Sequence, residues 1–190
     1  MTARLGDNLD VFFNKGFQRV EKQLTFASVL AANEIAKSVM AGVEKQLEKD
    51  IDRPTPFTKR AFKITRATKK NPVATVGIKP IQAEYLKYQI SGGTRHAKAI
   101  VIPSKGATNR YGNLPRGKLK KLEAQGKSFI ADGVVVQRMK RKNKAIAYVG
   151  AKKATYKKRF KFFERARNEA RVRANKHVTN SIRKALATAR

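Results

Sequence analysis

The sequence predicts an α+β fold: a long N-terminal helix, an antiparallel sheet of two hairpins plus a strand, and a long basic C-terminal helix. Apolar side chains recur every three or four positions in residues 1–52 and again in 152–190, which is typical of helices. Between them, residues 53–151 alternate apolar and polar side chains in short runs separated by turn-forming residues, which indicates strands. The chain has 190 residues and no internal repeat, so a single domain over 1–190 is expected.

The first helix is expected to use one long apolar stripe. Its members are Leu9, Phe13, Phe17, Val20, Leu24, Ala27, Ala31, Ile35, Val39, Val43 and Leu47. Pro54 and Pro56 prevent the helix from continuing into the body. A break near Gly16 or Gly42 is left open.

The body is expected to alternate strands with short helices. The expected elements are a hairpin of 62–65 and 74–78 around a turn at 69–72, a helix over 81–90 closed by glycines 92 and 93, a strand over 98–102, a helix from 119 that ends at Gly126, and a second hairpin of 134–136 and 146–149 with a charged tip at 141–144. Each strand run has apolar residues on one face, which favours one buried and one cationic face.

The last segment is expected to be helical over its whole length. Its stripe consists of Tyr156, Phe160, Phe163, Ala166, Ala170, Ala174, Val178, Ile182 and Ala185. The stripe changes from aromatic to alanine-sized residues, so the second half of this helix is expected to approach its partner closely or to pack thinly. The phenylalanines at 160, 162 and 163 are interpreted as core residues and not as platforms for stacked bases.

The positive charge is large and unevenly distributed. The chain has 44 Lys+Arg against 13 Asp+Glu, a net charge of +31. Residues 1–52 carry a net charge of −1, residues 53–151 carry +20 and residues 152–190 carry +12. Such a charge indicates nucleic acid, an anionic membrane or an acidic protein surface as partner. The asymmetry suggests that the N-terminal part packs on protein while the rest faces phosphate or acidic groups.

Catalytic, metal and cofactor chemistry is not expected. The chain has no cysteine, which excludes disulfides, thiolate metal sites and cysteine nucleophiles. His96 and Glu84 lack the spacing of a nucleophile and its base, and Glu123 and Asp132 come from other elements without a shared motif. The Gly92-Gly93-Thr94-Arg95 stretch is compatible with an anion-binding nest, but a tight turn is the preferred interpretation.

Membrane association is not expected either. No apolar run is expected to approach the ~18 residues that a membrane helix needs, and Asp7 and Asp10 interrupt the order of a signal peptide. A soluble protein made in a cytoplasm is therefore expected.

Eleven cations are the candidate partner-facing residues. They are Arg66, Lys69, Lys70, Arg138, Lys140, Arg141, Lys142, Lys157, Lys158, Arg159 and Arg165. We interpret them as facing DNA or an acidic partner, with a merely solvated face as the alternative. No helix-turn-helix, zinc finger or aromatic RNA platform is visible, which argues against sequence-specific recognition.

Several stretches resemble the tail-completion proteins of tailed bacteriophages, the family typified by phage lambda protein Z. The resemblance is carried by the sequences of residues 55–62, 66–67, 71–76, 82–86 with 92–95, and 109–113. It covers about residues 25–125 and the general form of the basic C-terminal helix.

The resemblance implies a non-enzymatic structural protein of the virion neck or proximal tail, made in the host cytoplasm. It also implies a ring-shaped homo-oligomer on the genome path, in contact with portal, adaptor or tail proteins and with packaged double-stranded DNA as a further partner. The residues themselves leave a second class open, a non-specific nucleic-acid-binding protein associated with a nucleoid or ribosome. A nuclease is the least favoured reading.

Overall fold

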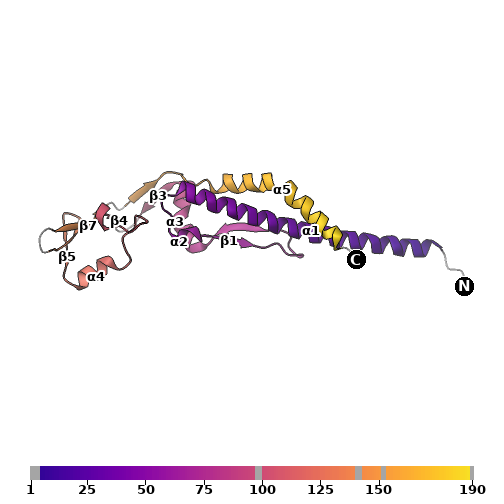
Figure 1. The fold of residues 1–190 in the computed structure, drawn as a ribbon, viewed down its shortest axis with the longest axis horizontal. Coiled ribbons are helices and arrows are strands. Elements are labelled where there is room, and N and C mark those ends of the chain that lie inside the picture. Colours follow the sequence, from indigo (N-terminus) through magenta and orange to yellow (C-terminus); the bar gives the residue numbers. More distant parts are fainter. Residues whose placement is uncertain (1–4, 97–99, 140–142, 151–152, 189–190) are drawn as a thin grey trace. The chain divides into compact units, whose positions relative to one another are not determined.

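The chain folds into an α+β structure, as its sequence predicts. The computed structural model describes residues 5–96, 100–139, 143–150 and 153–188 (Figure 1). Its contacts group the chain into two compact units. The helical unit comprises Met1–Gln46, Ala61–Pro80 and Phe162–Arg190, and the sheet unit comprises Leu47–Arg60 and Ile81–Lys161. Each unit therefore combines segments that are distant in the sequence.

The secondary structure follows the predicted order for most of the chain. The helices are α1 (Leu5–Asp50), α2 (Pro56–Lys59), α3 (Pro80–Ser91), the 3₁₀ helix η1 (Lys105–Ala107), α4 (Lys118–Ala124) and α5 (Phe162–Ala187). The strands are β1 (Phe62–Thr65), β2 (Thr75–Ile78), β3 (Gly93–His96), β4 (Ile100–Pro103), β5 (Ser128–Ala131), β6 (Val134–Gln137), β7 (Lys144–Gly150) and β8 (Lys153–Tyr156).

Helix α1 runs without interruption from Leu5 to Asp50, so neither glycine breaks it. Gly16 has open space around its Cα, whereas a Cβ on Gly42 would overlap the Glu169 side chain of α5. Gly42 therefore allows α5 to approach α1 at this point. The helix ends before Pro54, as the sequence predicts.

The helical unit consists of α1 as far as Gln46, the β1–β2 hairpin and α5. The hairpin is antiparallel, with Phe62 opposite Ile78. The Phe62 ring stacks on the Phe162 ring at a centroid distance of 5.9 Å, which joins the hairpin to the start of α5. The buried residues of this unit are Ala27, Ala31, Ala36, Val39, Val43, Ala61, Phe62, Ala67, Phe162, Ser181 and Ala185.

The sheet unit contains two antiparallel sheets. Strands β4, β7, β6 and β5 form a four-stranded sheet in that order, and β3 pairs with β8. Asp132 and Gly133 both have positive φ angles, of 47° and 73°, and make the tight turn between β5 and β6. Leu122 of α4 packs with Ala107 and Ile146 in the core beside the larger sheet.

A second cluster in the sheet unit forms around α3. Leu86 and Phe160 are almost completely buried. The backbone N–H groups of Arg159 and Phe160 both donate to the carbonyl of Gln89, so the segment after β8 is held on α3. The rings of Tyr88 and Tyr156 add a contact at 5.5 Å between centroids.

The expected helix over 152–190 is wrong in its first ten residues. Residues 153–156 form β8, which pairs with Gly93–His96, and α5 begins only at Phe162. The three-to-four spacing of Tyr156 and Phe160 had indicated a helix. Both residues instead pack on α3 from an extended segment, an arrangement that local periodicity does not distinguish. Strands β3 and β5 were likewise not predicted.

The glycines after α3 behave as the sequence predicts. Gly92 and Gly93 have φ angles of 74° and 114°, which favour glycine. The Gly92 N–H donates to the Tyr88 carbonyl and ends the helix. These angles fit the tight turn that the sequence predicts.

One apolar stretch of α1 corrects the expectation about hydrophobic length. Within Asn14–Asp50, this helix is long and apolar enough to cross a membrane by length and composition. The same helix supplies Ala27, Val39 and Val43 to the core of the helical unit. Protein packing therefore buries part of this apolar stretch.

The cluster around α3 generates a stability prediction. Leu86 is 1% exposed and Ile81, on the same helix, is 65% exposed. We expect Leu86→Ala to lower the free energy of unfolding by about 2–5 kcal/mol, because it removes buried methyl groups and leaves a cavity. The matched control, Ile81→Ala, is expected to cost less than about 1 kcal/mol. Urea denaturation followed by circular dichroism measures both, and equal losses would contradict the assignment.

Candidate interaction site

Three of the predicted cations lie together on the loop between β1 and β2. Arg66, Lys69 and Lys70 are exposed there. The loop is fixed to α1 through Ala67, whose N–H donates to Asn33 Oδ1 at 2.9 Å and whose carbonyl accepts from Asn33 Nδ2 at 3.2 Å. This pair of hydrogen bonds positions the cationic loop in the helical unit.

The remaining predicted cations are divided between the units. Exposed Lys157, Lys158 and Arg159 lie in the segment between β8 and α5, in the sheet unit, and not on a helix as predicted. Arg138 of the same unit has its guanidinium 5.3 Å from the centroid of the Phe129 ring. Lys140, Arg141 and Lys142 lie outside the described residues.

Arg165 belongs to an ion-pair cluster inside the helical unit. Its guanidinium contacts the Glu169 carboxylate one turn further along α5, and Arg173 approaches the same carboxylate at 3.7 Å. Glu169 has a side chain that is only 15% exposed. Arg165 therefore neutralises a largely buried carboxylate, which makes it the predicted cation least available to an external partner.

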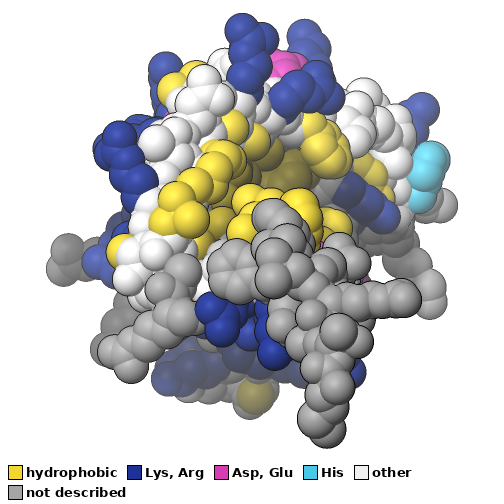
Figure 2. Space-filling model, turned by 90° about the vertical axis from the view of Figure 1, so that its right-hand side faces the viewer, with side chains coloured by type: hydrophobic (Ala, Val, Ile, Leu, Met, Phe, Trp, Pro, Cys, Tyr) yellow, Lys and Arg dark blue, Asp and Glu magenta, His cyan; other side chains and the backbone are white. Residues whose placement is uncertain are grey.

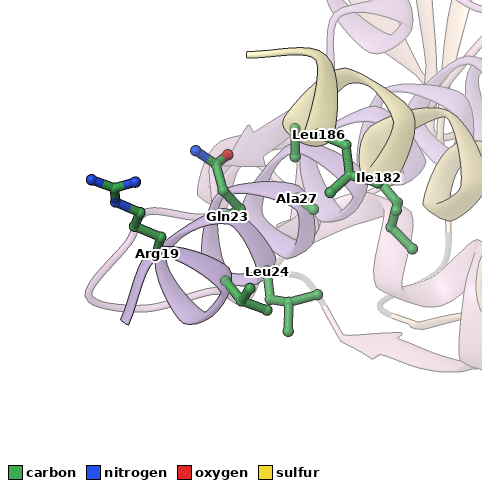
Figure 3. A pocket seen from close by; sticks show the side chains of 8 residues that line it. Arg19, Gln23, Leu24, Ala27, Ile182 and Leu186 are labelled. Carbon is green, nitrogen blue, oxygen red and sulfur yellow. The ribbon is translucent and has the colours of Figure 1, made fainter. Parts of the chain in front are cut away.

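The most distinctive surface of the helical unit is an apolar groove between α1 and α5, which we call the α1–α5 groove. It consists of two adjoining hollows of about 130 and 480 Å³. Buried Ala27, Ala31 and Ala185 are among its lining residues. The larger lining residues are Val20, Leu24, Ile35, Val178, Ile182 and Leu186. In Figure 3, Ile182 and Leu186 of α5 lie across from Leu24 of α1.

Large apolar side chains remain exposed along this groove. The exposed fractions are 57% for Val20 and Leu24, 39% for Ile182 and 65% for Leu186. Seen from the end where both termini lie, hydrophobic side chains line a hollow and Lys and Arg side chains surround it (Figure 2). Contiguous apolar surface inside a polar margin is typical of a protein interaction site.

The two helices that form the groove are held at a fixed separation by polar and small residues. The Ser38 hydroxyl and His177 Nε2 are hydrogen bonded at 2.9 Å. One turn further along α1, Gly42 admits the Glu169 side chain. Ala27 and Ala185 both line the groove at the other end of this contact, so α1 and α5 run antiparallel.

The groove was not predicted from the sequence, although the sequence contains the signal. The sequence predicts both apolar stripes, and it predicts that the second half of α5 approaches its partner closely or packs thinly. It does not indicate which segment each stripe faces or how much of the stripe that segment covers. Alanines 27, 31 and 185 occupy the contact, so the larger side chains on either side are left uncovered.

The residues considered for catalysis do not form a cluster. Glu84 is exposed on α3, His96 on β3, Glu123 on α4 and Asp132 in the β5–β6 turn. Within the described ranges, no group of three or more His, Asp or Glu side chains is arranged to hold a metal ion.

Comparison of the chain with models of known protein families, with curated protein sequences and with solved structures gives no match.

The hold of Asn33 on the cationic loop can be tested directly. We expect Asn33→Leu to accelerate amide hydrogen exchange at Ala67, because the N–H and C=O of this buried residue lose both hydrogen bonds to the Asn33 side chain, a loss worth about 1–3 kcal/mol. Asn175→Leu, at an exposed position of α5, is the control and is expected to leave the rate unchanged. An unaltered rate in Asn33→Leu would contradict this role.

Glu34 provides a prediction about pH. The hydrogen bond from Lys37 Nζ, at 2.7 Å, lowers the pKa of Glu34, and the positive charges of Lys37, His177 and Lys184 act in the same direction. The pair stabilises the fold above the ordinary carboxyl pKa, and this stabilisation is lost as the pH falls through the lowered value.

We therefore expect Lys37→Gln to raise the pKa of Glu34 toward its ordinary value, as measured by NMR titration of the carboxyl carbon. The loss of stability at neutral pH is expected to be no more than about 0.5 kcal/mol, because the pair is partly exposed. It should vanish in acid, when Glu34 is protonated in both proteins. A Glu34 pKa that does not respond would contradict the assignment.

Proposed function

We propose that this chain is a structural assembly protein of a tailed bacteriophage, acting as a neck, head–tail connector or tail-completion subunit in a homo-oligomer on the genome path. The observation that carries the proposal is the α1–α5 groove, where Val20, Leu24 and Leu186 are more than half exposed. A surface of this kind supports a role in protein assembly. The phage assignment itself rests on the sequence resemblance to tail-completion proteins.

The charge of the chain suits a position on the genome path, close to DNA and acidic proteins. By sequence, the sheet unit carries 25 basic and 6 acidic residues, and the helical unit 19 basic and 7 acidic residues. A homo-oligomer multiplies this charge, so counter-charge from DNA or acidic neighbouring proteins must lie close in the assembly. Proximity to packaged DNA and acidic portal, adaptor or tail proteins would both supply it.

A non-specific nucleic-acid-binding protein is the second candidate. The exposed cations at 66, 69 and 70 and at 157–159 favour it, because each phosphate they neutralise would add to the affinity. The cations do not account for an apolar groove. We therefore rank assembly on protein first and contact with nucleic acid second.

The two candidates differ in what drives association. We expect nuclease-treated protein in high salt to give a discrete oligomeric mass by light scattering, and this mass should not change when a short DNA duplex is added after dialysis. Apolar contacts persist in salt, whereas phosphate contacts weaken steeply. A monomer that assembles only on DNA, and dissociates as salt rises, would instead favour the nucleic-acid binder.

The virion role requires a separate test. If the chain joins heads to tails, particles produced without it should accumulate as separate heads and tails under electron microscopy, and added wild-type protein should join them. Val172→Ser, at a position 73% exposed and outside the groove, serves as a control that should join them equally well. Joined particles in the absence of the chain would contradict the proposal.

A further inference from the structure

The side chains of α1 are uncovered over residues 14–22. Residues 14–22 are all exposed, including Phe17 at 71% and Val20 at 57%. Figure 1 shows this stretch of α1 extending past the C-terminal end of α5 within the helical unit. A short unpacked helical stretch gains little stability from its own hydrogen bonds. Phe17 would stabilise it only if another surface buried the ring.

The apolar stripe of the groove continues into this free stretch. Leu24, Val20 and Phe17 follow one another at helical spacing, and the sequence extends the pattern to Phe13 and Leu9. The same chain thus carries an uncovered apolar helix and, adjoining it, an uncovered apolar groove. One surface is convex and the other concave, so they are complementary in chemistry and in form.

The lengths of the two features also agree. On α1 the groove extends from Arg19 to Ile35. These seventeen residues span about 25 Å at 1.5 Å per residue, and the stretch 5–20 spans about 24 Å. The alanines and Ser28 along the groove leave room for aromatic side chains of an incoming helix, which would pack as a third helix against α1 and α5.

Charge does not oppose the binding of this stretch. Lys and Arg side chains surround the hollow (Figure 2), and Arg19 is one of the residues that line it (Figure 3). Most of the protein is strongly basic, whereas residues 1–52 have a net charge of −1. The stretch 5–20 carries two acidic and two basic side chains, so it brings no excess positive charge to this margin.

We propose that the α1–α5 groove binds the N-terminal stretch of α1, residues 5–20, from a second copy of this chain. The inference rests on the self-assembly in the proposed function and names its interface. Each copy has one stretch and one groove. The contact is therefore able to close as a two-fold pair, in which both stretches are exchanged, or to continue from copy to copy around a ring.

The absence of native cysteine permits a clean test by disulfide trapping. One full-length variant carries Phe17→Cys, and a second, of different tag mass, carries either Val178→Cys or Leu186→Cys in the groove. A disulfide between two such variants joins separate chains by construction, and it requires Cα atoms within about 7 Å. Val172→Cys is the matched control, since it lies on the same helix, is more exposed than Val178 and does not line the groove.

We expect mild oxidation to give the mixed disulfide with a groove cysteine several-fold more than with Val172→Cys. Trapping at position 186 would indicate that the incoming stretch lies antiparallel to α1 of the receiving copy, and trapping at position 178 that it lies parallel to this helix. Both results support the proposal. Equal or lower yield at both groove positions than at 172 would overturn it.

A second measurement separates this interface from the proposed function. Light scattering is expected to show that Phe17→Glu and Ile182→Glu each reduce the oligomer to the monomer, with helix content kept. If neither variant changes the oligomer, the interface is overturned and the connector role stands. If both variants lose the oligomer, and heads and tails still join when the chain is missing, the interface stands and the connector role is refuted. Binding to phosphatidylglycerol vesicles that Phe17→Glu abolishes, without mixed disulfides, would make lipid the occupant and overturn the proposal.

Discussion

The helical unit depends on the contact of α1 with α5 through small residues. Gly42 admits the Glu169 side chain, and Ala27 and Ala185 are almost completely buried where the helices meet further along. Small side chains let two helices approach closely, but they bury little apolar area themselves. The larger aliphatic side chains therefore lie beside the contact and not within it. The α1–α5 groove is the direct consequence of this choice of residues.

The hairpin and the start of α5 complete the unit from the other side. Phe62 stacks on Phe162, and Asn33 holds the loop after β1 through two hydrogen bonds to Ala67. These contacts leave the cations of that loop exposed while fixing its backbone. A charged surface on a fixed loop loses less conformational entropy on binding than one on a free loop, which suits a partner-facing role.

Two kinds of surface thus coexist on the chain, and they suit different partners. The exposed cations favour phosphate or acidic protein, with a strength that depends on salt. The groove offers apolar contacts, which persist as salt rises. The proposed connector role would use both surfaces, because such a subunit would contact its own copies while it lies close to DNA and to acidic neighbours. Either surface alone would fit a wider range of proteins.

The sequence by itself determined the features that local chemistry controls. Helical periodicity and two prolines defined α1 and its end, alternation defined both predicted hairpins, and Gly92 and Gly93 defined a turn that needs positive φ. Tertiary structure alone decided the rest. Strand β8 pairs with β3, about sixty residues away, so Tyr156 joined a sheet although its spacing fitted a helix. The groove, likewise, depends on which part of each apolar stripe the partner helix covers. Periodicity reports that a face is apolar, whereas only the packing of distant segments determines how much of that face remains uncovered.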